Sequence, residues 1–158
     1  MGDGAWCLDR RRTDRCSSPR NSCGRRFGWI AAAVTFVYDA GVFIAAERDD
    51  RAVWADHRAR LELGFVPVTT APVVAQVSRS GRQVQLRRFL RGCDVVAFTP
   101  TQAHAVGALL GAAGATDVID AHVVLVAGAS GSDVLSSDEE DLIPLAAKLP
   151  SPVRILPV

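Results

Sequence analysis

The 158-residue sequence has few aromatic residues, a single lysine and no long apolar run. No segment reaches the roughly 18 consecutive apolar residues of a membrane-spanning helix, so we expect a cytoplasmic protein with no membrane association. An aromatic content of 6% beside many alanines and valines is typical of a compact α/β protein. The length favours one domain with a substantial buried core.

Cysteine is also scarce, and its spacing excludes the common cysteine-based sites. Cys7, Cys16 and Cys23 lie near the N-terminus, whereas Cys93 lies far from them. Intervals of nine and seven residues match no zinc-binding pattern. We therefore expect neither a structural zinc site nor a disulfide framework.

Residues 1–33 differ in composition from the rest of the chain. They carry seven arginines and three aspartates and have no apolar period. We interpret residues 1–33 as a disordered basic N-terminal extension and residues 34–158 as one folded domain. Two alternatives are a basic arm that binds nucleic acid and a natural translation start at Val34. Residues 34–158 carry eleven bases and fourteen acids, so their acids need a local explanation.

Strand-like and helix-like segments alternate along residues 34–158. The strands are predicted at 34–38, 65–69, 93–98, 134–135 and 153–156. The helices are predicted at 41–47, 51–64, 71–79, 82–90, 100–110, 116–127 and 139–149. Such alternation with short links predicts a mainly parallel sheet covered by helices on both faces.

Aspartates stand where strands end or helices begin. Asp39 and Asp138 each follow a predicted strand, and Asp117 and Asp120 open the apolar helix at 116–127. On a helix these last two carboxylates are roughly 60° apart and separated by about 4.5 Å along the axis. Because ligands of open α/β sheets bind outside the carboxyl ends of the strands, we expect the aspartates to meet there.

Helix capping is the alternative reading of these acids, because carboxylates near a helix N-terminus accept hydrogen bonds from free N–H groups. Asp138 can be both a cap and a ligand. Converging carboxylates without basic partners repel by roughly 4 kcal/mol per pair at 4 Å and a dielectric of about 20, which a divalent cation relieves. Oxygen ligands select Mg²⁺ or Mn²⁺, which can activate a water for attack on a phosphodiester. Further acids lie nearby in the sequence: Glu47, Glu139, Glu140 and Asp141.

A local run of arginines is the main basic feature of the folded part, at Arg79, Arg82, Arg87, Arg88 and Arg91. Such a run is usually a solvated helix face, but beside a metal site it can hold the phosphates of a nucleic acid. We interpret the histidines as structural: His57, His104 and His122.

Four segments in order resemble the successive motifs of the PIN domain, and more narrowly of the VapC toxins of type II toxin–antitoxin modules. They are VYDAG (37–41), APVVAQVSR (71–79), TDVIDA (116–121) and LSSDEEDL (135–142). The resemblance covers residues 34–158 and implies a three-layer α/β/α fold with a mainly parallel central sheet. It also implies a Mg²⁺-dependent endoribonuclease, with Mn²⁺ as the other metal, that cleaves RNA, forms a homodimer and is inhibited by a cognate antitoxin.

The resemblance also assigns the site. Asp39, Asp120 and Asp138 fall on three acidic catalytic positions, and the same residues together with Asp117 are the expected metal ligands. The family's second acidic position, normally glutamate, falls on Gln76, where a neutral amide replaces a charged ligand.

Two arginines complete the expected site, and two other readings remain. Arg79 stands where such toxins often carry an arginine, and we expect Arg79 and Arg82 to bind RNA.

The substitution at Gln76 favours a second hypothesis, a catalytically weak or inactive PIN-like module that binds RNA or a protein partner. A phosphoacceptor receiver domain fits less well, because Asp39 has no acidic neighbour and Lys148 lies in a predicted helix.

Overall fold

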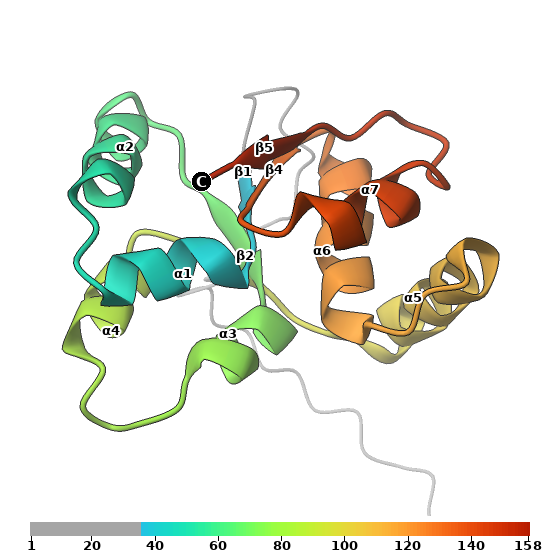
Figure 1. Ribbon diagram of the computed structural model, residues 1–158, viewed down its shortest axis with the longest axis horizontal. Coiled ribbons are helices and arrows are strands. Elements are labelled where there is room, and N and C mark those ends of the chain that lie inside the picture. The colour runs from blue at the N-terminus through green and yellow to red at the C-terminus, as the bar shows by residue number, and fades with distance from the viewer. Residues whose placement is uncertain (1–35) are drawn as a thin grey trace, which may run out of the picture.

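Five parallel strands form the centre of the protein in the order β3-β2-β1-β4-β5 (Figure 1). The computed structural model describes residues 36–158, and the predicted extension at 1–33 lies outside them. The strands are β1 (Phe36–Tyr38), β2 (Val68–Thr70), β3 (Asp94–Val96), β4 (Asp133–Ser136) and β5 (Ile155–Pro157). The predicted parallel sheet is therefore confirmed.

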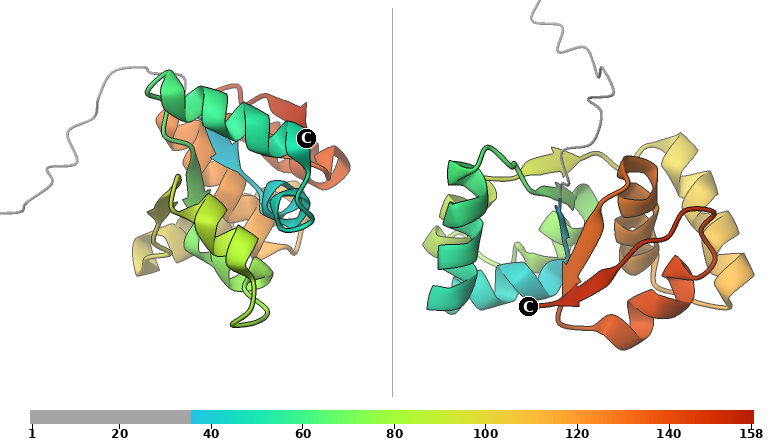
Figure 2. Two further views of the ribbon diagram at one scale, coloured as in Figure 1. Left: turned by 90° about the vertical axis from the view of Figure 1, so that its left-hand side faces the viewer. Right: turned by 90° about the horizontal axis from the view of Figure 1, so that it is seen from above.

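Helices cover both faces of the sheet, as Figures 1 and 2 show. One layer holds α1 (Ala40–Glu47), α2 (Arg51–Glu62) and α4 (Val84–Leu90), and the other holds α5 (Pro100–Ala113), α6 (Val118–Ser130) and α7 (Glu139–Ala146). Helix α3 (Ala71–Val77) contacts both α1 and α6. This arrangement confirms the three-layer α/β/α architecture.

Several element boundaries differ from those predicted, and two of the differences have a local reason. The strand predicted at 65–69 starts only at Val68, after Pro67, which has no N–H to donate to a neighbouring strand. The helix predicted at 116–127 continues to Ser130 and ends at Gly131, whose φ of 64° is the left-handed conformation of a helix C-cap. The helix predicted at 139–149 ends at Ala146.

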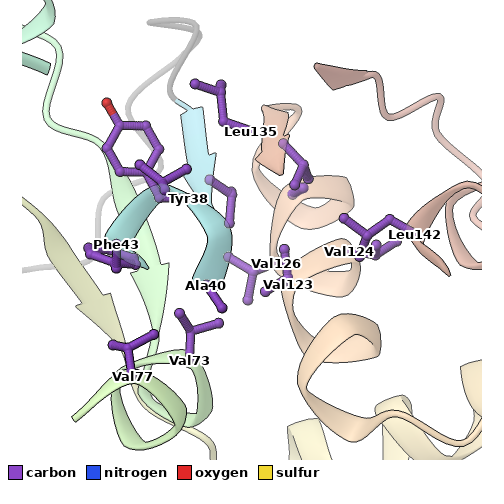
Figure 3. Close-up of a cluster of buried hydrophobic side chains, with 14 of the residues drawn as sticks. Tyr38, Ala40, Phe43, Val73, Val77, Val123, Val124, Val126, Leu135 and Leu142 are labelled. Atoms are coloured by element: carbon purple, nitrogen blue, oxygen red, sulfur yellow. The ribbon is translucent and has the colours of Figure 1, made fainter. Parts of the chain in front are cut away.

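The core lies on both sides of β1, as Figure 3 shows. Tyr38 and Phe43 pack on one side, with their ring centroids 6.2 Å apart, and Phe89 of α4 joins them at 6.0 and 5.7 Å. Val123 and Val124 of α6 lie on the other side and are fully buried. Burial of these side chains holds β1, and hence the residue that follows it, at a fixed depth in the protein.

No single helix within residues 36–158 is long and apolar enough to cross a membrane. Helices α5 and α6 reach that length and composition only as a pair, which is bent by 104° at the break between them.

Two of the three histidines are buried, in agreement with a structural role. His57 stacks on Phe89 with centroids 4.0 Å apart, and His122 meets the edge of Phe98 at 4.8 Å. Both ring nitrogens of His122 are buried without a hydrogen-bond partner. His104 is exposed on α5.

Burial lowers the pKa of both His57 and His122, so these rings stay neutral in the folded protein where the unfolded chain takes up protons. Stability is therefore lost as the pH falls below about 6.5, the ordinary pKa of histidine. We expect His122→Leu to reduce the difference in melting temperature between about pH 8 and about pH 5, and the exposed control His104→Leu to leave it unchanged. Equal acid sensitivity of the parent and His122→Leu in thermal unfolding would contradict this account.

Candidate metal centre

Asp39 lies at the carboxyl end of β1 and is held from the neighbouring strand β4. It occupies the N-cap position of α1, but its side chain makes no capping hydrogen bond. Its backbone N–H donates to the carbonyl oxygen of Leu135 (3.0 Å), and its Oδ2 accepts a hydrogen bond from Ser136 Oγ (2.7 Å). The carboxylate is only 6% exposed.

Asp138 is connected to Asp39 through the same serine. Ser136 Oγ accepts a hydrogen bond from the backbone N–H of Asp138 at 2.9 Å while it donates to Asp39. Asp138 is the N-cap residue of α7, yet its exposed side chain makes no capping bond. Both aspartates that follow strands therefore keep carboxylate oxygens that no helix cap uses.

A second pair of acids comes from the start of α6. Asp117 caps this helix: its Oδ1 accepts hydrogen bonds from the N–H groups of Ile119 (2.7 Å) and Asp120 (3.2 Å). The capping reading is thus confirmed for Asp117. Asp120 lies in the first turn, is partly buried and accepts no capping bond.

The charges of these acids reach one another. Burial raises the pKa of Asp120 to about 7, and the negative charges of Asp117 and Asp39, followed by Asp141 and Asp138, contribute to the rise. Burial likewise raises the pKa of Asp39, with smaller contributions from Asp138 and Asp117, whereas the hydrogen bond from Ser136 opposes it. The fold therefore brings all four predicted aspartates into one electrostatic cluster.

No base neutralises this cluster within residues 36–158. The two ion pairs of these residues lie elsewhere, between Arg60 and Asp56 (2.6 Å) and between Arg154 and Asp133 (2.5 Å). In the same part of the chain, no three Asp, Glu, His or Cys side chains are placed closely enough to hold a metal ion together. By charge and donor type the carboxylates suit a hard divalent cation, and the exposed side chain of Asp138, which makes no capping bond, is the one free to reorient towards it.

Close packing fixes the loop that carries Asp138 against α1. A Cβ at Gly41 would lie 2.2 Å from Ser137 Oγ and 3.0 Å from the Ser137 backbone nitrogen. Only glycine therefore allows the β4–α7 loop to approach the first turn of α1 this closely.

The other predicted residues are not among the groups whose charges act on Asp39 and Asp120. Gln76 on α3 is partly buried, and its Oε1 is buried without a hydrogen-bond partner. Glu47 accepts a hydrogen bond from the Leu86 N–H at 3.1 Å and so anchors the start of α4. Arg79 and Arg82 are exposed in the loop between α3 and α4.

Three participants in the site are absent from the residues assigned to it from the sequence. Ser136 bridges Asp39 and Asp138, Gly41 permits the loop to approach, and Asp141 adds its charge at Asp120. The sequence signal that could have identified Ser136 is a polar residue directly after the predicted apolar strand at 134–135. Asp141 is three residues after Asp138, so the two residues lie on the same face of the first turn of α7.

The fold is similar to two solved structures. A structure of PAE2754 from Pyrobaculum aerophilum matches with a TM-score of 0.53 and 17% identity, over 77% of this chain and 83% of that one. VapBC2 from Rickettsia felis, solved with a DNA fragment from its promoter, matches with a TM-score of 0.56 and 13% identity, over 78% and 98%. No protein-family model matches the sequence, and no curated protein matches it. The chain has a three-layer α/β/α fold of the PIN-like type, as predicted from the sequence.

Ionisation of Asp120 costs stability, because its pKa in the folded protein is above the usual value of about 3.9. A raised carboxyl pKa means that stability is lost as the pH rises from about 4 through about 7. We expect Asp120→Asn to raise the stability near pH 8 by on the order of 1–2 kcal/mol, allowing for solvent screening, and to have little effect at about pH 4.

Thermal unfolding in EDTA at both pH values measures this difference. Glu140→Gln is the matched control. Glu140 is an exposed acid in the first turn of α7, so its replacement removes a similar interaction with a helix dipole. An Asp120→Asn variant that is no more stable than Glu140→Gln at high pH would show that the acids do not repel one another.

Proposed function

We propose that this protein is a metal-dependent endoribonuclease that acts as the toxin of a toxin–antitoxin pair. The observation that carries the proposal is the unneutralised cluster at the carboxyl ends of β1 and β4, where the charges of Asp117 and Asp39 help to raise the pKa of Asp120 and those of Asp138 and Asp117 help to raise the pKa of Asp39. Structural ion networks normally pair acids with bases, so a cluster of acids alone is typical of a site that takes a cation or a proton.

Mg²⁺ or Mn²⁺ is the cofactor that fits the donors. Asp39, Asp117, Asp120 and Asp138 would hold it, directly or through its waters, with carboxylate oxygens, the ligands that these ions prefer. A bound ion of this kind lowers the pKa of a water and offsets charge on a phosphodiester. Asp117 has one oxygen engaged in the α6 cap, so its other oxygen is the available donor.

The chain's own groups orient the reaction. Ser136 holds the Asp39 carboxylate through Oδ2 and fixes the backbone of Asp138. Asp120, with a pKa of about 7 while no cation is bound, would give up its proton at neutral pH when a divalent cation binds beside it. The N-termini of α1, α6 and α7 all open at these aspartates, and their helix dipoles favour an anionic phosphate there.

RNA is the proposed substrate, and Arg79 and Arg82 are the proposed contacts to its backbone. Both arginines are exposed, and neither forms an ion pair within residues 36–158. A cognate antitoxin and a second copy of the chain are the proposed protein partners, by analogy with the VapBC2 complex.

A catalytically weak or inactive PIN-like module is the second candidate function. It is favoured by Gln76, which carries no charge at the position where the family's motif has glutamate, and by the spacing of the acids, of which no three are placed to share an ion in residues 36–158. Such a module would bind RNA or a partner without cleaving it.

RNA cleavage by the full chain distinguishes the two. We expect cleavage with Mg²⁺ or Mn²⁺ that stops on chelation, and a loss of about a hundredfold or more in Asp39→Asn and in Asp120→Asn. Asp94→Asn makes the same chemical change at an exposed position of β3 and is expected to retain full activity. Undiminished cleavage by Asp120→Asn would refute the assignment of this site.

The missing charge at Gln76 gives Asp117 a larger expected role. Asp117→Asn keeps a good N-cap residue but removes one negative charge, so we expect the Mg²⁺ concentration for half-maximal cleavage to rise by about tenfold. Adding Gln76→Glu should restore part of the affinity, which a double-mutant cycle measures. Mn²⁺ binding by calorimetry gives a readout that is independent of cleavage.

Asp50→Asn is the matched control for this cycle. Asp50 caps α2 with the same pair of bonds, to the N–H groups of Ala52 (2.8 Å) and Val53 (3.2 Å). If Asp117→Asn behaves like Asp50→Asn and Gln76→Glu shows no coupling, then Asp117 serves only as a helix cap.

A further inference from the structure

We propose that the pocket between α1, α3 and the start of α4 binds one unpaired base of the RNA, beside the bond that is cleaved. The inference rests on the proposed ribonuclease function and adds a base-recognition site to it. The pocket has a volume of about 280 Å³. This is just below the about 300–1,000 Å³ of typical small-molecule pockets, so the space suits a single base.

The walls of the pocket are apolar. Phe43 and Ile44 of α1 face Val77 of α3 and Leu86 of α4 across it. Ile44 is 44% exposed, whereas Phe43 is fully buried, so the pocket has a solvent-facing edge and a closed floor. Unpaired RNA bases are commonly held in this way, with apolar contacts to their faces and polar contacts to their edges.

Gln76 supplies the polar contact. Gln76 lines the pocket, and its Oε1 is buried without a hydrogen-bond partner, so a donor on a bound ligand would satisfy it. The neighbouring amide, Gln83, is already engaged: its Oε1 accepts from the N–H groups of Arg79 (2.7 Å) and Ser80 (2.9 Å), and its Nε2 donates to Val77 (3.0 Å). Gln76 is therefore the amide that can read the edge of a base, with one acceptor and two donors.

Two arginines at the same pocket match the charge of a nucleotide. Arg48 and Arg79 both line it, and neither is in an ion pair within residues 36–158. The only acid of the lining, Glu47, already accepts a hydrogen bond from the Leu86 N–H. A guanidinium group can bind a phosphate with two hydrogen bonds or stack on a base.

The position of the pocket links it to the acidic cluster. Phe43 is four residues after Asp39, so the pocket begins about 6 Å along α1 from the catalytic end of that helix. A nucleotide next to a phosphate at the aspartates would thus reach it. An RNA base is favoured over a protein segment, because so small a pocket offers little of the about 800 Å² that each partner of a stable protein complex buries.

Binding of single nucleotides to the full chain tests the proposal without any cleavage. In EDTA, AMP, GMP, CMP and UMP are titrated while backbone amide shifts are followed by NMR, with ribose 5-phosphate as the probe that lacks a base. We expect at least one nucleotide to shift residues of α1, α3 and the 78–83 loop, and to bind about tenfold or more tightly than ribose 5-phosphate.

Ile44→Trp fills the pocket edge and is expected to weaken nucleotide binding about tenfold, whereas Leu63→Trp, at a 73% exposed position after α2, leaves it unchanged. Arg79→Gln is a second variant, expected to weaken nucleotides and ribose 5-phosphate alike. Equal binding of ribose 5-phosphate, unaltered binding by Ile44→Trp, or shifts confined to other elements would overturn the proposal.

Cleavage of RNA by the parent chain separates this inference from the proposed function. A parent that binds nucleotides in the pocket but cuts no RNA refutes the ribonuclease and supports the base site. A parent that cuts RNA but binds no nucleotide there refutes the base site alone, as does a peptide partner that perturbs these residues where no nucleotide does.

Discussion

Repulsion among carboxylates is the constraint on which the arrangement at the carboxyl ends of β1 and β4 depends. Three helices, α1, α6 and α7, begin there, and each has an aspartate at its N-cap. The helix dipoles offset part of the repulsion. Only Asp117 uses its side chain to satisfy a helix end, so Asp39 and Asp138 forgo the stabilisation that their positions would allow. This is the pattern expected where stability is given up for ligand binding.

The register of the parallel sheet fixes the distances between the residues that carry this site. Tyr38 is in register with Leu135, so the residues that follow, Asp39 and Ser136, lie side by side although they are 97 positions apart in the sequence. The buried valines of α6 then place the start of that helix, with Asp120, against the same edge. The geometry of the acids thus follows from packing far from them, and not from contacts among the acids.

The fold, and the meeting of the four aspartates in one electrostatic cluster, could be predicted because both depend on local signals. Alternating strands and helices set the architecture; Asp39 stands out because it directly follows β1, and Asp138 because it comes two residues after β4. The sequence could not predict that Asp117 caps α6 while Asp120 leaves its carboxylate uncapped. This difference depends on whether the helix begins one residue earlier or later. The bridging role of Ser136 depends on the strand register, which no local pattern records.

The loop between α3 and α4 is held almost wholly by its own residues. The Gln83 side chain joins both of its ends, Ser80 Oγ accepts from the Arg82 N–H (3.0 Å), and Arg87 donates to the carbonyl of Ser80 (3.3 Å). Such a segment behaves as an exchangeable module: its arginines can be replaced or reordered without disturbing the sheet that positions the acids. For the proposed ribonuclease this means that preference for one RNA over another can change in this loop without any change at the aspartates.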